Sequence, residues 1–185
     1  MHRDAAWSRL TGMASDLQKR KMSAVFGAMD ANGDGKLEKA DFDALTKRWL
    51  AVSRDADAEV LRSTMDRWWT VLREASDHND DDEVTLDEVI TAAGDQMLMV
   101  DLVVSTAEAM FAAVDLDGNG SITAQEYATM IHAWTGNDAS TDEVFALLDL
   151  NGDGELSKSE FARHWVEFWA GDDPDAPANN AFGLI

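Results

Sequence analysis

Oxygen-bearing side chains recur at every second position in four short segments of the sequence. The segments start at Asp30, Asp77, Asp115 and Asp149, and each places Asp or Asn at its first, third and fifth positions. A calcium ion takes six to eight hard oxygen ligands at about 2.3–2.6 Å. Such closely spaced carboxylates and amides therefore predict sites for a divalent cation.

The third and fourth segments match the twelve-residue EF-hand loop in full. Gly120 and Gly154 stand at position six, where the backbone must turn sharply, and Glu126 and Glu160 stand at position twelve. Glycine enters left-handed backbone conformations at little steric cost, and a glutamate at position twelve can give both carboxylate oxygens. The predicted ligands are Asp115, Asp117, Asn119, the Ser121 carbonyl and Glu126 in the third loop, and Asp149, Asn151, Asp153, the Glu155 carbonyl and Glu160 in the fourth.

The first loop runs from Asp30 to Asp41 and departs from the pattern at its last position, where Asp replaces Glu. The shorter side chain reaches an ion with one oxygen more easily than with two. A lower coordination number approaches the octahedral geometry of magnesium. We therefore expect magnesium to compete with calcium at this loop.

The second loop, Asp77 to Glu88, has Asp82 where the other loops have glycine. Aspartate enters the left-handed region more readily than most residues, so the loop is strained but not forbidden. Five acids between Asp80 and Asp87 repel one another in the absence of a cation. Two interpretations stay open: an ion site, or a structural partner for the first loop.

Position eight carries a branched apolar residue in every copy, namely Leu37, Val84, Ile122 and Leu156. In a pair of EF-hands these residues face each other across a short two-stranded contact. The sites should therefore work in pairs, the first with the second and the third with the fourth.

Composition limits the partners of the chain. Its 15 Lys and Arg stand against 36 Asp and Glu, which gives a formal net charge of −21. This charge repels nucleic acids and anionic membranes, so neither is an expected partner. There is no cysteine for a disulfide or a thiolate site. Residues 1–21 read as an amphipathic helix and not as a signal peptide, and we expect a cytoplasmic monomer.

Apolar residues at helical spacing flank every loop, as in Val25 and Met29 before the first loop and Phe42, Leu45 and Trp49 after it. We predict an all-α fold in which four EF-hands form two pairs packed into one compact unit. The expected parts are an N-terminal pair (1–93), a C-terminal pair (94–170) and a tail (171–185). Ser140 to Glu143 reads as a capping box at the start of a helix.

Prolines at 174 and 177 stiffen the tail just before its last apolar residues, Phe182, Leu184 and Ile185. A stiffened segment suits a tail that folds back over the core. A disordered acidic tail is the alternative.

The chain resembles the four-EF-hand sarcoplasmic calcium-binding protein family, including a bacterial member of it. The likeness rests on the long helix before Asp30, the glycine-less loop at Asp77, the Trp-rich helices after the loops and the C-terminal segment. It implies a compact helical fold, no enzymatic activity, a role in calcium buffering or transport, and about three bound calcium ions, in the first, third and fourth loops. The ligands that it implies in the first loop are Asp30, Asn32, Asp34, the Lys36 carbonyl and Asp41.

EF-hand loops also occur in proteins with other functions. A calmodulin-like sensor would need Met-rich grooves that open for a partner helix, although no protein target is indicated. A calcium-regulated photoprotein is disfavoured because Tyr127 is the only tyrosine near the candidate His and Trp residues. A hydrolytic enzyme is disfavoured because the carboxylates stand at ion-ligand spacing.

Overall fold

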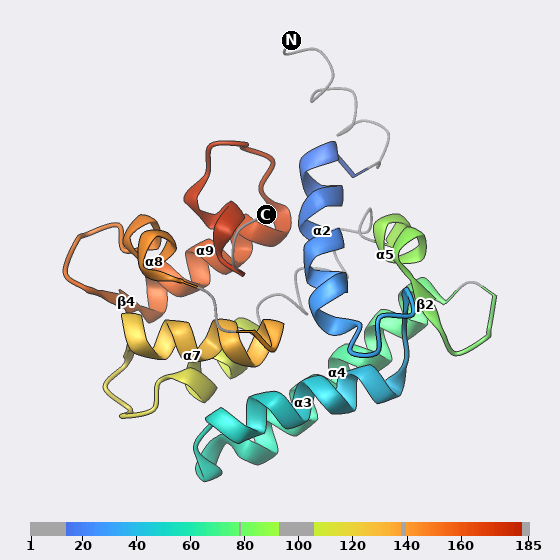
Figure 1. Ribbon diagram of the computed structural model, residues 1–185, viewed down its shortest axis with the longest axis horizontal. Helices are drawn as coiled ribbons and strands as arrows, with labels where there is room; N and C mark the ends of the chain where they lie inside the picture. The colour runs from blue at the N-terminus through green and yellow to red at the C-terminus, as the bar shows by residue number, and fades with distance from the viewer. Residues whose placement is uncertain (1–13, 78, 93–105, 138–139, 183–185) are drawn as a thin grey trace.

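The computed structural model describes residues 14–77, 79–92, 106–137 and 140–182. In Figure 1 the loops of the N-terminal half lie towards the right and those of the C-terminal half on the left. Each half contains two loops joined by a short two-stranded sheet. The predicted all-helical fold with two loop pairs is confirmed. The boundary that was predicted at residues 93 and 94 lies outside the described residues.

The N-terminal half places its two loops side by side through strands β1 and β2. The strands are antiparallel, and Leu37 lies opposite Val84 as the spacing predicted. Both side chains are fully buried, at 1% and 0% exposure. The elements in chain order are α2 (Asp16–Met29), β1 (Lys36–Leu37), α3 (Lys39–Val52), η1 (Asp55–Asp57), α4 (Ala58–Ser76), β2 (Val84–Thr85) and α5 (Leu86–Ala92).

The C-terminal half repeats this arrangement. Its strands β3 and β4 are antiparallel, and Ile122 lies opposite Leu156. Residues 106–114 form the helix that enters the third loop. The elements that follow are β3 (Ser121–Thr123), α7 (Ala124–Thr135), α8 (Asp142–Leu148), β4 (Glu155–Ser157), α9 (Lys158–Ala170) and η2 (Pro177–Asn180).

Two predictions about helices are wrong. The helix expected from Met1 to Lys21 is not continuous, because Ser15 is the N-cap of α2: its Oγ accepts the Gln18 N–H at 3.1 Å, and its own N–H donates to Gln18 Oε1 at 3.0 Å. Residues 1–13 lie outside the described part of the chain. The helix α8 has Thr141 as its N-cap with no side-chain cap, so Ser140 does not open a capping box.

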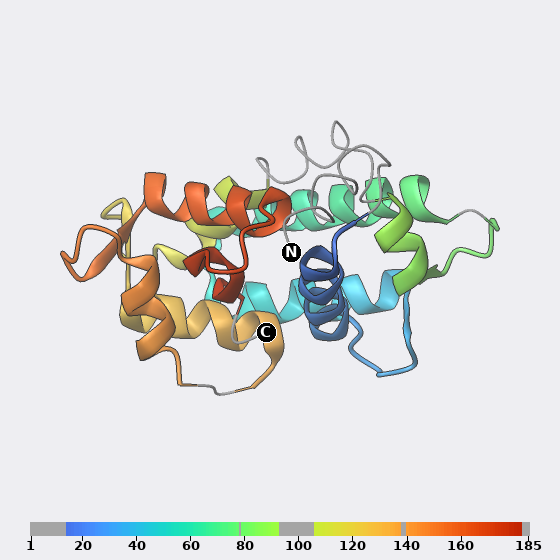
Figure 2. The same ribbon diagram turned by 90° about the horizontal axis from the view of Figure 1, so that it is seen from above.

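Aromatic side chains join the two halves. Trp68 of α4 stacks on Trp134 of α7, with ring centroids 5.8 Å apart and planes 17° apart. Trp134 also meets Trp49 of α3 edge-on at 6.3 Å. Figure 2 shows the two halves side by side with α3 and α4 running beneath both. Burial of these large rings favours one packed body over two separate lobes.

Arg48 of α3 adds polar contacts to the same interface. Its guanidinium donates to the Ala28 carbonyl at 2.8 Å, to the Trp134 carbonyl at 3.0 Å and to the Ala133 carbonyl at 3.1 Å. Cationic groups are favourable at helix C-termini, where carbonyls lack intrahelical partners. One side chain thus ties the ends of α2 and α7 together.

The tail lies against the C-terminal half. The Phe182 side chain is 9% exposed, and its ring lies 4.5 Å from Phe168, 4.8 Å from Trp165 and 4.9 Å from Trp134 between centroids. Tyr127 donates its hydroxyl to the Ala181 carbonyl at 3.2 Å. Residues 184 and 185, which were expected to join this cluster, lie outside the described residues.

Candidate metal centre

The first, third and fourth loops share one backbone shape. Their position-six glycines, Gly35, Gly120 and Gly154, have φ of 84°, 86° and 86°. The left-handed turn directs each glycine N–H at the position-one carboxylate, with N–O distances of 2.9 Å to Asp30, 3.0 Å to Asp115 and 2.8 Å to Asp149. The first ligand of each loop is therefore oriented by the backbone.

Three candidate carboxylates of the third loop lie close together. Oxygens of Asp115, Asp117 and Glu126 all lie within 4.8 Å of one another. Asp115 and Glu126 are nearly buried, at 6% and 7% exposure. Like charges held this close in a partly buried site favour binding of a cation, and the all-oxygen donor set fits a hard divalent ion. The chemistry of these residues therefore fits calcium.

The position-twelve residue closes each loop. In the third loop Glu126 accepts the Leu116 N–H at 2.9 Å through one oxygen and the Thr123 N–H at 2.8 Å through the other. Asp41 makes the same two contacts in the first loop, at 3.1 Å to Ala31 and 2.9 Å to Glu38. The shorter Asp41 side chain therefore bridges the two ends of its loop as Glu126 does.

The fourth loop is the most exposed of the three. Asp149 accepts the Gly152 N–H at 2.8 Å through its second oxygen, and the Asn151 amide donates to Asp153 at 2.9 Å. Glu160 is 9% exposed and accepts the Ser157 N–H at 3.0 Å. The ligand candidates of this loop are thus held by contacts within the loop.

Position-seven residues meet across each loop pair. Ser121 donates its hydroxyl to Glu155 at 2.5 Å. Lys36 forms an ion pair with Glu83, and the hydrogen bond to Glu83 raises the pKa of Lys36. The predicted carbonyl ligands Lys36, Ser121 and Glu155 therefore all belong to the strands that join the loops.

The second loop reaches the same shape without glycine. Asp82 has φ of 61°, and its N–H donates to Asp77 at 3.0 Å as the glycines do in the other loops. Asp80, at position four, has φ of 59°. Each such conformation costs of order 1 kcal/mol. Sequence reasoning anticipated Asp82 but missed Asp80, although glycine at position four of the other three loops was a signal for it.

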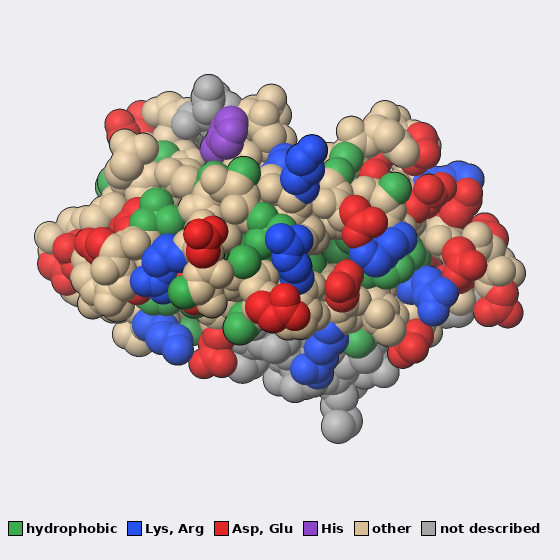
Figure 3. Space-filling model, turned by 90° about the horizontal axis from the view of Figure 1, so that it is seen from below, with side chains coloured by type: hydrophobic (Ala, Val, Ile, Leu, Met, Phe, Trp, Pro, Cys, Tyr) green, Lys and Arg blue, Asp and Glu red, His purple; other side chains and the backbone are tan. Residues whose placement is uncertain are grey.

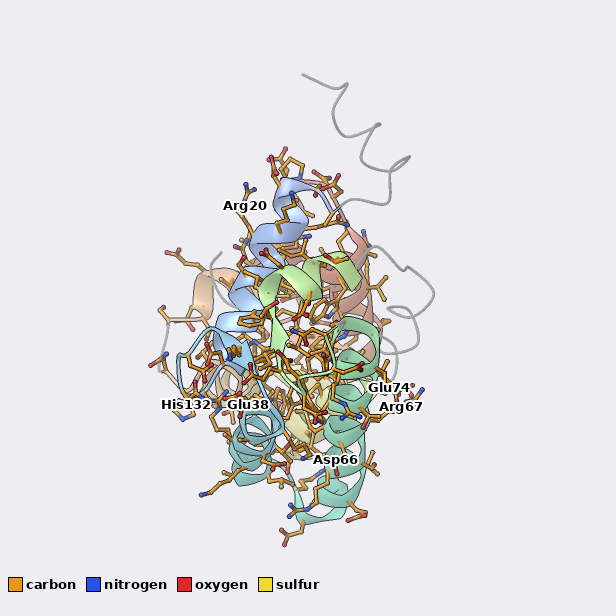
Figure 4. The ribbon with its side chains drawn as sticks, turned by 90° about the vertical axis from the view of Figure 1, so that its right-hand side faces the viewer. Arg20, Glu38, Asp66, Arg67, Glu74 and His132 are labelled. Carbon is orange, nitrogen blue, oxygen red and sulfur yellow. The ribbon has the colours of Figure 1, made fainter. Side chains whose placement is uncertain are left out.

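Charge is distributed unevenly over the surface. Figure 3 shows acidic side chains at both ends of the molecule, where the loops lie, and Lys and Arg interspersed with further acids across the face between them. Figure 4 shows Asp66, Arg67 and Glu74 on α4, with Asp66 on the side towards α3. Asp66 pairs with Lys39 at 3.0 Å. Some acidic residues outside the loops, such as Asp66, thus form ion pairs, whereas the loop carboxylates are concentrated at the two ends of the molecule.

Two family models match the chain. The model of an EF-hand domain pair matches residues 104–166, and the model of a single EF hand matches residues 22–46. These ranges contain the third and fourth loops and the first loop. No curated protein sequence matches the chain.

Solved structures show the same fold at low sequence identity. A sarcoplasmic calcium-binding protein from amphioxus aligns with a TM-score of 0.68 and 18% identity, over 92% of this chain and 98% of that one. A calcium-binding protein of Streptomyces coelicolor, described in terms of prokaryotic calcium-mediated regulation, aligns with a TM-score of 0.68 and 22% identity, over 84% and 99%. Calcium-loaded apo-aequorin from Aequorea victoria aligns with a TM-score of 0.67 and 18% identity, over 87% and 94%.

The resemblance to sarcoplasmic calcium-binding proteins is confirmed at the level of the fold. Photoproteins share this architecture. Because the sequence identity to each of these solved structures is below 25%, the similarity shows the fold alone. Among the described residues, no helix is long and apolar enough to cross a membrane.

Proposed function

We propose that this EF-hand calcium-binding protein is a cytoplasmic calcium buffer or transporter that takes up about three ions, in its first, third and fourth loops. These three loops have glycine at positions four and six and a buried carboxylate at position twelve. The second loop carries two strained aspartates in place of the glycines. Its role in the proposal is to pair with the first loop through β1 and β2.

Side-chain oxygens at positions one, three, five and twelve and the carbonyl at position seven would hold each ion. The third loop offers three clustered carboxylates, whereas the first and fourth have an asparagine at position three, Asn32 and Asn151. The first loop ends in Asp41, whose side chain is shorter than that of glutamate, so magnesium competes with calcium there. We propose no catalytic residue, nucleic acid, membrane or protein partner, and we propose a monomer.

The observation that carries the buffer function is the packing of Phe182. A sensor exposes an apolar groove when calcium arrives, and a partner helix fills that groove. Here the ring of Phe182 fills the space between Trp134, Trp165 and Phe168. Phe182 of the chain itself therefore covers the aromatic surface of the C-terminal half that a partner helix would otherwise bind.

A titration with a hydrophobic dye separates buffer from sensor. We expect the intact chain to bind little dye in excess calcium, and we expect dye binding to rise in a chain truncated after Asp173. Phe182→Ala should reproduce the rise without removing the segment. Val166→Ala is the matched control, because Val166 lies on α9 and is already 45% exposed.

The sensor function is the competing outcome. It is supported if calcium increases dye binding to the intact chain, and the buffer proposal then fails. Native mass spectrometry in excess calcium checks the ion count: one or two ions would remove the first loop from the proposal, and four would add the second.

A further inference from the structure

The turn between α3 and α4 brings an arginine of the N-terminal half against the third loop of the C-terminal half. In Figure 1 this turn lies at the lower left, beneath the C-terminal half. Arg54 holds Asp57 of its own turn at 2.8 Å through Nε and donates Nη2 to the Ala112 carbonyl at 3.4 Å. Its Nη1 lies so close to Gly118 that a Cβ there would be 2.7 Å away.

This contact distinguishes the third loop from its counterparts. Gly33 and Gly152 occupy the same fourth position in the first and fourth loops, and a Cβ on either would meet no atom within 4 Å. Gly118 lies between Asp117 and Asn119, two of the candidate ligands. A guanidinium therefore lies beside the loop that, among the described residues, brings three carboxylates within 4.8 Å of one another.

The electrostatic consequence follows from the signs of the charges. The hydrogen bond to Asp57 raises the pKa of Arg54, and the charges of Asp115 and Asp117 add to this effect. The same two carboxylates would hold a cation. A positive side chain next to Gly118 stabilises the ion-free carboxylates of this loop and repels an incoming divalent ion.

We propose that Arg54 is an affinity-determining residue of the third loop, which weakens calcium binding there and couples it to the packing of the two halves. Because coupling is reciprocal, calcium in the third loop weakens the hold of Arg54 on Ala112 and Gly118. The first and fourth loops have no such contact at position four, so Arg54 acts on neither of them directly. This inference rests on the proposed calcium site in the third loop.

Arg54→Gln tests the proposal by removing the charge. Calcium titration followed by two-dimensional NMR reads each loop separately, because the N–H groups of Gly35, Gly120 and Gly154 each bond to the first ligand of their own loop. We expect about two- to ten-fold tighter binding reported by Gly120, the range of a screened charge near a surface. Gly35, in the other loop pair, should report an unchanged affinity, and Gly154 should shift less than Gly120, through the contact between β3 and β4 alone.

Two further variants separate charge from structure. Arg54→Lys keeps the charge and should stay near the parent affinity, and Lys47→Gln removes an exposed cation of α3 as the matched control. The gain in Arg54→Gln should shrink between ~0.02 M and ~0.5 M salt, as screening shortens the reach of the charge. Arg54→Gln with unchanged or weaker affinity at Gly120 overturns the inference. Absence of any calcium response at Gly120 in the parent overturns the proposed site itself.

Discussion

Removing the apolar contact between the third and fourth loops should weaken both calcium sites at once. Ile122 and Leu156 face each other across β3 and β4 and are 0% and 1% exposed. Ile122→Ala deletes three buried carbons. At about 0.8 kcal/mol each, with a further term for the cavity, the loss in free energy of unfolding is about 3 kcal/mol.

A loss of this size should lower the thermal midpoint by roughly 6–12 °C, since about 1 kcal/mol shifts a chain of this length by about 2–4 °C. Leu156→Ala should behave alike, and the double variant should lose less than the sum, with a coupling of about 0.5–3 kcal/mol. Val166→Ala, on the surface of α9, is the control and should change little.

Denaturant unfolding in excess calcium measures the stability, and the N–H resonances of Gly120 and Gly154 measure ion binding in each loop. We expect Ile122→Ala to weaken binding at both glycines, whereas Leu37→Ala should act on Gly35 alone. If Ile122→Ala weakens the third loop and leaves the fourth at its parent affinity, the two loops are not one unit and the reasoning is refuted.

Four shorter predictions follow from the same structure. Chelator should lower the thermal midpoint, because each ion adds two charges and three ions change the net charge from −21 to −15; an unmoved midpoint contradicts this. Asp41→Ala should remove one ion from calorimetric titrations with calcium or magnesium, and an unchanged count would count against the first site. Asp82→Gly should change stability by less than about 1 kcal/mol, since relief of strain is offset by glycine entropy and the lost Arg73 ion pair; chemical denaturation giving more than about 2 kcal/mol would refute this balance. Burial raises the pKa of Tyr127, the only tyrosine, so the contribution of its buried neutral phenol to folding stability is present below pH ~10 and is lost as pH rises further. Phenolate absorbance should therefore appear near pH ~10 only in the chain truncated after Asp173.

The loops were predictable because each one is specified by twelve consecutive residues. Spacing of oxygen donors, glycine at position six and the apolar residue at position eight specify each loop and its partner, and the register of Leu37 with Val84 followed directly. The ligand sets stay predictions, although the structure brings Asp115, Asp117 and Glu126 together.

Contacts between the halves could not be predicted in the same way. Arg54 and Gly118 are far apart in sequence, and no periodicity connects a turn residue with a loop glycine. The Trp68–Trp134 stack likewise depends on how two complete halves dock. The helix start at Ser15 was missed because apolar spacing continues through it, while its capping box with Gln18 depends on one local conformation.

The stacked indoles also have an optical consequence. Trp68 comes from the N-terminal half and Trp134 from the C-terminal half, and Trp134 in turn meets Trp49 and Phe182. Excitation energy passes between indole rings with a probability that falls steeply with their separation. Light absorbed in one half is therefore shared with the other only while the halves remain docked, and the polarisation of the emission reports their separation in the unlabelled protein.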